Sequence, residues 1–146
     1  MEKTDRQILT LLAEDGRMSF TDLGKATGLS TSAVHQRVKR LEERGLIVGY
    51  AARVDLAEMG LPLTAFVSIT PIDAAQPDDY PERLRGIEAI ESCWSVAGEE
   101  SYILKIRVAK PTDLEDLLGR IRSSANVSTR TTIVLSTPYE DRSVLG

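Results

Sequence analysis

The chain has 146 residues, of which 42% are hydrophobic and 27% are charged. This balance is typical of a globular protein and excludes a disordered or fibrous one, and no apolar run approaches the roughly 18 residues that span a bilayer. An amphipathic pattern follows Met1 without the core of a signal peptide, so we expect a cytoplasmic protein. One cysteine and one histidine exclude an intrachain disulfide and a thiolate-built zinc site, so we expect no metal and no cofactor.

The net charge of −4 is unevenly distributed along the chain. Residues 1–61 carry nine Lys and Arg against nine Asp and Glu, whereas residues 62–146 carry nine against thirteen. Within the first part, segment 30–41 holds three basic side chains and no carboxylate. A local basic face of this kind is what contact with nucleic-acid phosphates requires.

The first 45 residues predict three helices. A capping box at residues 4–7 begins a helix that ends at residues 15–16, and a second helix follows over 19–28. A cap on Ser30 or Thr31 begins the third helix, which Gly45 closes. Its apolar stripe consists of Val34, Val38 and Leu41.

After the third helix the pattern changes to that of β structure. Residues 46–54 predict a strand or hairpin, which would make the helical unit winged-helix-like, and Gly60 and Pro62 mark a connector. We therefore expect a helix-turn-helix domain over 1–50, a linker over 51–62 and a second domain over 63–146.

The second domain predicts four strands and two helices in the order β-α-β-β-α-β. We expect one helix with Tyr80, Leu84 and Ile87 on its buried face, and another that begins with a capping box at residues 112–115. This order is the ferredoxin-like pattern, an antiparallel sheet with helices on one face, so the fold class is α+β. The predicted strands span 63–70, 90–97, 101–108 and 127–135. The uncovered face must be solvated or buried, and dimerisation would bury it economically.

A short helix, a glycine-containing turn and a helix with a small polar start form the geometry that places a recognition helix in the major groove. Gln36 can pair bidentately with adenine, while basic residues would contact phosphates. The candidate DNA-binding residues are Arg17, Ser30, Thr31, Ser32, His35, Gln36, Arg37, Lys39 and Arg40. The alternative is a solvated charged face, with His35 an ordinary surface histidine.

Several motifs together resemble the Lrp/AsnC (feast/famine) family of transcription regulators. In the first half these are Asp5-Arg6-x-Ile8-Leu9, Asp15-Gly16-Arg17, Leu23-x-x-x-x-Gly28-Leu29-Ser30, Arg37-Val38-x-Arg40-Leu41-Glu42-x-x-Gly45-Leu46-Ile47 and Gly49-Tyr50. In the second half, residues 96–102 resemble the family's effector loop and residues 129–135 its final strand. The resemblance covers nearly the whole chain in order.

This resemblance implies a DNA-binding regulator that takes free amino acids between subunits and assembles as dimers, commonly into tetramers or octamers. The implied effector-binding residues are Ser95, Val96, Gly98, Glu99, Glu100, Ser101 and Tyr102, with Ile133, Val134 and Ser136 near the pocket. A glycine lets backbone N–H groups approach a carboxylate, and an acidic side chain can hold an ammonium group. Many relatives have aspartate where this chain has Ser101, so Glu99 or Glu100 would take over that contact or the effector range would differ.

The sequence is compatible with three functions. The favoured one is a regulator of amino-acid metabolism that responds to amino acids and associates with the nucleoid. A second is an architectural DNA-binding protein without an effector, and a third, less favoured because no catalytic constellation is present, is an enzyme or binding module with a vestigial helix-turn-helix. Residue by residue, Glu99 and Glu100 also fit a solvated turn. Trp94 and Tyr102 fit strand core positions, and Cys93 fits a small buried hydrophobe.

Overall fold

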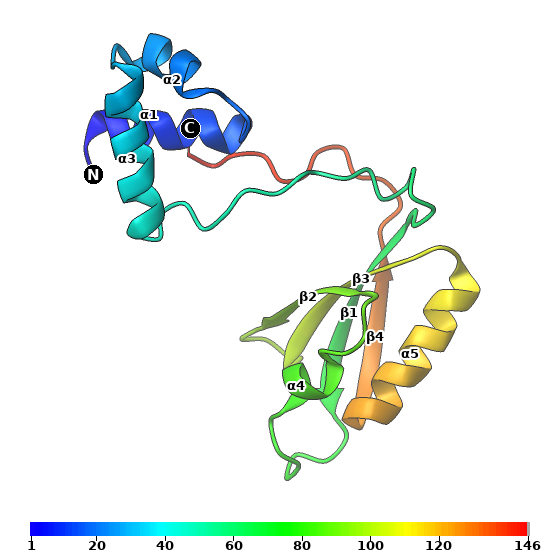
Figure 1. Cartoon of the computed structure of the whole chain (residues 1–146). Helices are drawn as coiled ribbons and strands as arrows, with labels where there is room; N and C mark the ends of the chain where they lie inside the picture. The colour runs from blue at the N-terminus through cyan, green and yellow to red at the C-terminus, as the bar shows by residue number, and fades with distance from the viewer. Residues whose placement is uncertain (146) are drawn as a thin grey trace. The chain divides into compact units, whose positions relative to one another are not determined.

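The computed structural model describes residues 1–145, which divide into two compact units (Figure 1). The first comprises residues 1–53 together with the C-terminal segment 139–145, and the second comprises Val54–Pro138. The C-terminal segment, which we expected to belong to the second domain, thus packs with the first. Among the described residues, no helix is long and apolar enough to cross a membrane.

The first unit contains three helices, α1 (Lys3–Glu14), α2 (Phe20–Thr27) and α3 (Thr31–Glu43), as predicted. Each helix contributes an apolar stripe, because residues three and four apart share a helix face. The stripes meet in one small core. Its buried members are Ile8, Leu23, Val34, Val38 and Leu41.

The turn between α2 and α3 is tight and depends on glycine. Gly28 ends α2 with a left-handed φ of 75°, and its N–H donates to the Gly24 carbonyl oxygen over 2.8 Å. A Cβ at Gly24 would lie only 2.6 Å from the carbonyl oxygen of Leu29, so no side chain fits there. Ser30 then caps α3, because its hydroxyl accepts from the Ala33 N–H over 3.2 Å. These contacts fix the orientation of α3 relative to α2.

Two sequence predictions in this unit are wrong. The capping box at residues 4–7 does not form, because α1 already begins at Lys3 with Glu2 as its N-cap and no side-chain cap. Residues 46–54 form no strand. A strand needs a hydrogen-bonding partner, and the described part of a single chain pairs none with this segment, whose Val48 side chain is 96% exposed.

The second unit is a four-stranded antiparallel sheet of order β2-β3-β1-β4, as the ferredoxin-like pattern predicts. Its strands are β1 (Leu63–Pro71), β2 (Ile90–Ser95), β3 (Tyr102–Val108) and β4 (Val127–Ile133), and its helices are α4 (Tyr80–Leu84) and α5 (Pro111–Ala125). Alternate β1 residues Ala65, Val67 and Ile69 are fully buried against both helices. The core lies between one face of the sheet and the helices.

The opposite face of the sheet carries Phe66, Trp94 and Ile103. Ile103 pairs with Ser68 of β1 and with Trp94 of β2, and directly paired residues point to the same face of a sheet. Phe66 is two residues before Ser68 on the same strand and therefore shares that face. The Phe66 and Trp94 rings stack with centroids 6.5 Å apart, and Trp94 is 45% exposed. We call this surface, with Phe66, Trp94 and Ile103 at its centre, the open sheet face.

Three local expectations for this unit are wrong. Pro111 occupies the first turn of α5, so residues 112–115 lie inside the helix and form no capping box. Trp94 is on the open sheet face, not in the core. Cys93 faces the helices but is exposed, because β2 is an edge strand and α4 is only five residues long.

Candidate DNA-binding and effector-binding sites

The solvent-facing side of α3 gathers most of the predicted DNA-binding side chains. Val34, Val38 and Leu41 fix the buried side, so the polar residues between them point outward. We call this outward side the α3 face. Its exposed members are Thr31, Ser32, His35, Gln36, Lys39 and Arg40, with the cap Ser30 at its start.

The α3 face is chemically suited to DNA. Small hydroxyl side chains stand at the N-terminal end of the helix, where backbone N–H groups and the dipole favour phosphate. Gln36 lies in the middle, with Lys39 and Arg40 one turn further on. For these three side chains, no hydrogen bond or ion pair is found within residues 1–145. They are available to a ligand.

Two side chains that we predicted to contact DNA instead contact other residues of the helical unit. Arg37 Nη1 donates to Glu2 Oε2 over 2.8 Å and to Asp5 Oδ1 over 2.9 Å, joining α3 to the start of α1. The hydrogen bond to Glu2, followed by that to Asp5, raises the pKa of Arg37. The His35 ring meets Phe20 of α2 edge-on, with centroids 5.2 Å apart. Arg17 lies outside the α3 face, in the loop between α1 and α2.

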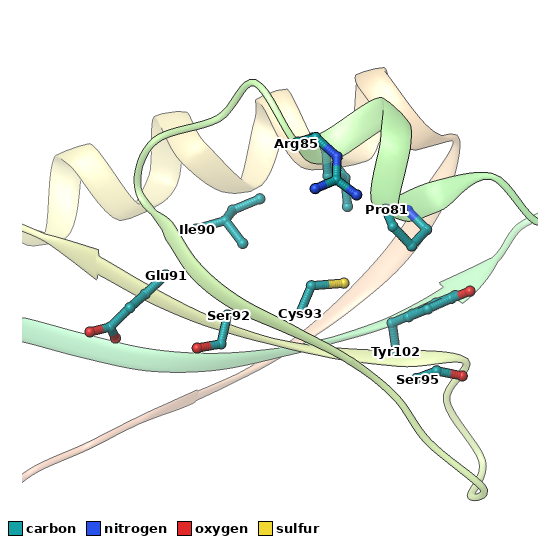
Figure 2. A pocket seen from close by; sticks show the side chains of 9 residues that line it. Pro81, Arg85, Ile90, Glu91, Ser92, Cys93, Ser95 and Tyr102 are labelled. Atoms are coloured by element: carbon teal, nitrogen blue, oxygen red, sulfur yellow. The ribbon is translucent and has the colours of Figure 1, made fainter. Parts of the chain in front are cut away.

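A pocket of about 470 Å³ lies in the second unit between α4 and the edge strand β2 (Figure 2). Two predicted effector-binding residues, Ser95 and Tyr102, line it and pair with each other across β2 and β3. Figure 2 shows the Arg85 guanidinium above Cys93, with Tyr102 at one end of the pocket and Glu91 at the other. We call this cavity the α4 pocket. Its remaining lining residues are Pro81, Leu84, Ile90 and Ser92.

The electrostatics of the α4 pocket come from a few groups. Burial raises the pKa of the Cys93 thiol, Arg85 opposes that rise and Glu82 adds to it. The Tyr102 hydroxyl donates to Asp78 Oδ1 over 2.9 Å, and this hydrogen bond is the main cause of its raised pKa. Arg85 therefore gives the pocket a cation, and apolar Leu84 and Ile90 form part of its wall.

The predicted effector loop adjoins this pocket. The Val96 N–H donates to the Ser101 carbonyl oxygen over 3.2 Å. The Ser101 N–H donates to the Ile69 carbonyl oxygen over 3.0 Å, and this hydrogen bond ties the loop to β1. A Cβ at Gly98 would meet only the Glu100 carboxylate, at an ordinary 3.7 Å, and Gly98 has no left-handed φ. The conformation of the loop therefore does not itself require a glycine at this position.

The remaining predicted effector residues, Ile133, Val134 and Ser136, lie at the other end of the sheet. Ile133 pairs with Ala65, whereas Tyr102 pairs with Ile69, four residues further along β1. That is roughly 13 Å along the strand. One chain does not bring the two sets together.

Sequence reasoning missed the wall of the pocket that α4 and β2 supply. Pro81 and Arg85 follow a polar loop, and residues 90–93 were predicted only as part of a strand. The available signal was Arg85 itself, a cation that directly follows Leu84 of the predicted apolar stripe. The turn residue Gly24 was also missed. Within residues 1–145, no cluster of three or more His, Cys, Asp or Glu is placed to hold a metal ion.

Comparison with known families matches both units. An AsnC-type helix-turn-helix domain matches residues 1–42, and an Lrp/AsnC ligand-binding domain matches residues 64–144. The chain is therefore a helix-turn-helix transcription regulator with a ligand-binding domain, not an enzyme.

Individual relatives agree over nearly the full length. The HTH-type transcriptional regulator LrpA of Mycobacterium tuberculosis is 55% identical over 97% of this chain and 95% of its own. The leucine-responsive regulatory protein of Escherichia coli is 35% identical over 92% of this chain and 85% of its own. The chain belongs to the Lrp/AsnC family, as its motifs suggested.

Solved structures give the same result. The crystal structure of M. tuberculosis LrpA has a TM-score of 0.86 at 53% identity and full coverage of both chains. A feast or famine regulatory protein from M. tuberculosis in complex with L-methionine has a TM-score of 0.96 at 54% identity, covering 99% of each chain. A Neisseria meningitidis regulator, also in complex with L-methionine, has a TM-score of 0.89 at 26% identity, covering 96% of this chain and 93% of its own.

Proposed function

We propose that this protein is a homodimeric, sequence-specific regulator of amino-acid metabolism that acts on the bacterial nucleoid and responds to a free amino acid. The observation that carries the DNA-binding half is the α3 face, where Gln36, Lys39 and Arg40 stand exposed behind a capped helix start. In a dimer, two such faces would meet half-sites about 34 Å apart on double-stranded DNA.

The open sheet face supports the dimer. Phe66, Trp94 and Ile103 form an apolar centre on a surface that neither helix of the unit covers. Antiparallel sheets tolerate solvent on one face, but an exposed tryptophan in contact with a phenylalanine is typical of an interface centre. Further assembly into tetramers or octamers would use other surfaces. Trp94→Ser should shift sedimentation toward smaller species, and unchanged sedimentation would contradict this interface.

The effector site is proposed to lie between subunits. The Ser95–Tyr102 loop and the Ile133–Ser136 segment occupy opposite ends of one sheet, so they can share a ligand only if they come from different chains. Both L-methionine complexes among the relatives support a small amino acid as the ligand. Arg85 in the α4 pocket would hold the carboxylate, and Glu99 or Glu100 of the loop would hold the ammonium group.

Two measurements test the effector half. Bound L-methionine should slow alkylation of Cys93 in the α4 pocket. In the Arg85→Ala variant, the methionine concentration needed for the same protection should be at least tenfold higher, as expected for a lost charged hydrogen bond. Arg83→Ala, which removes a cation already paired with Asp79, is the matched control. If none of the twenty amino acids protects Cys93 or changes Trp94 fluorescence, the effector proposal fails.

The DNA half is tested on duplexes selected by the full chain from a random pool. The double variant Gln36→Ala and Arg40→Ala should lose binding by at least tenfold while its circular dichroism is unchanged. Binding of equal strength to selected and unselected DNA would instead favour an architectural protein. Unchanged binding by the double variant would overturn the assignment of α3 as the recognition helix.

A further inference from the structure

The C-terminal segment returns to the helical unit after the last strand. Residues 139–145 belong to the first unit, although they follow β4 of the second. The chain therefore passes between the two units twice, once after Arg53 and once after Pro138. Nothing in the sequence patterns indicated this second passage, because residues 136–146 have neither helical nor strand periodicity.

Specific contacts hold this segment on α1. Arg6 Nη2 donates to the Leu145 carbonyl oxygen over 3.2 Å. The Leu145 side chain is half-buried, in contrast to its neighbour Val144, which is 96% exposed. Leu145 lines a hollow of about 210 Å³ whose other lining residues are Leu9, Leu12, Ala13, Leu46, Ile47, Val48, Gly49 and Tyr50. We call this hollow the α1 groove.

A second hollow shows that the two passages enter the helical unit side by side. It measures about 350 Å³ and is lined by Ala13 and Glu14 at the end of α1, by Arg53 of the first passage, and by residues 140–143 of the second. The same two passages also leave the sheet together, because Ala65 near the start of β1 pairs with Ile133 at the end of β4. Nearby, Arg142 lies over the Tyr139 ring at 4.4 Å from its centroid.

We propose that the α1 groove is a docking surface for the C-terminal segment of the same chain, with Leu145 as its apolar anchor and Arg6 as its polar clamp. The docked segment covers Leu9 and Leu12, which the small core of the helical unit leaves only partly buried. Docking also attaches the helical unit, by noncovalent contacts, to the segment that follows β4.

Hydrogen exchange of the full-length protein tests the docking. Leu145→Asp should speed amide exchange by roughly tenfold in residues 9–13 and at Leu46 and Ile47, whose N–H groups donate to the Leu41 carbonyl oxygen, because it removes a half-buried leucine from the groove. Val144→Asp adds the same charge one residue earlier, on an exposed side chain, and should leave these rates within about twofold. Equal effects of the two variants, or no effect of either, would overturn the proposal.

Cross-linking identifies the source of the segment. Ala13→Cys and Ser143→Cys, which line the same hollow, are combined in a Cys93→Ser background and treated with a short bis-maleimide. A monomer-sized product that contains the linked peptides is expected. A dimer-sized product would overturn docking in the same chain in favour of a second copy, and no cross-link would overturn docking altogether. Neither experiment needs DNA or an amino acid, so both stand apart from the proposed function.

Discussion

The two units of this protein differ in the interactions that stabilise them. The sheet unit has fourteen buried residues in one core between its strands and helices, whereas the helical unit has five. A small unit buries less of its surface and has little stability in reserve. The helical unit therefore depends on individual local features: the tight turn at Gly24, the cap at Ser30 and the ion pairs of Arg37. The sheet unit can tolerate imperfect detail at its edge, which is where its pocket lies.

Core truncation should show this difference most strongly. Leu41→Ala is expected to cost about 2–5 kcal/mol, enough to unfold the helical unit and abolish DNA binding. Leu104→Ala removes the same atoms from the larger core and should weaken the sheet unit while leaving it folded at 25 °C. Urea unfolding followed by circular dichroism, with DNA binding measured in parallel, checks both. Normal DNA binding by Leu41→Ala would mean that the helical unit has a larger free energy of unfolding than its small core implies.

Two glycine substitutions, one in each unit, should change the free energy of unfolding in opposite directions. Gly24→Ala places a Cβ against the Leu29 carbonyl, which is backbone and cannot move aside, and should destabilise the helical unit by about 1–3 kcal/mol. Gly119→Ala lies in α5 with nothing within 4 Å of the new Cβ and should stabilise the sheet unit by about 0.5–1 kcal/mol. Thermal unfolding measures both, and two changes of the same sign would refute the argument.

A smaller effect is expected at the cap of α3. Ser30→Ala removes the hydroxyl that accepts from Ala33 and should cost about 1 kcal/mol. Ser32→Ala, inside the same first turn, removes a hydroxyl that caps no backbone N–H and contacts only the Ser30 hydroxyl, at 3.3 Å, so it should cost less. Comparing the unfolding free energies of the two variants separates capping from any role of these serines in DNA contact, because DNA is absent from the measurement.

The accuracy of the sequence predictions followed the range of the interactions involved. The three helices, the β-α-β-β-α-β order of elements along the chain and the buried stripes came from periodicity, which is local. Residues 46–54 have the composition of a strand, but a strand forms only with a partner, and residues 1–145 of a single chain supply none. The capping boxes at residues 4–7 and 112–115 failed because neighbouring residues, Lys3 and Pro111, started each helix earlier.

The candidate sites divide in the same way. The α3 face could be predicted because Val34, Val38 and Leu41 settle which residues point outward. The α4 pocket could not, since its wall depends on how the five-residue α4 packs against the edge strand β2, which periodicity does not show even though the two elements are consecutive in the chain. Strand alternation alone places Cys93 and Trp94 on opposite faces, so expecting both in the core was inconsistent. What the alternation could not show is how little of Cys93 the short α4 covers.

The smallest expected effect is on the reactivity of Cys93. Burial raises the pKa of its thiol and Arg85 partly opposes that rise, so the thiolate, which is the reactive form, is scarcer than in an unfolded chain. Alkylation by iodoacetamide should therefore show a pH midpoint above the ordinary value near ~8.5. Because the folded state favours the protonated thiol, the corresponding stability is present below that value and is lost as pH rises through the folded pKa.

Substituting Arg85 sharpens this test of the α4 pocket. Arg85→Ala should move the midpoint for Cys93 alkylation further upward, because the cation that favours the thiolate is gone, whereas Arg85→Lys should retain most of the original value. Arg130→Ala alters a cation on β4, away from the α4 pocket, and should leave the midpoint unchanged. An unchanged midpoint in Arg85→Ala would mean that the guanidinium does not act on Cys93. The carboxylate-binding role proposed for Arg85 would then lose its geometric basis.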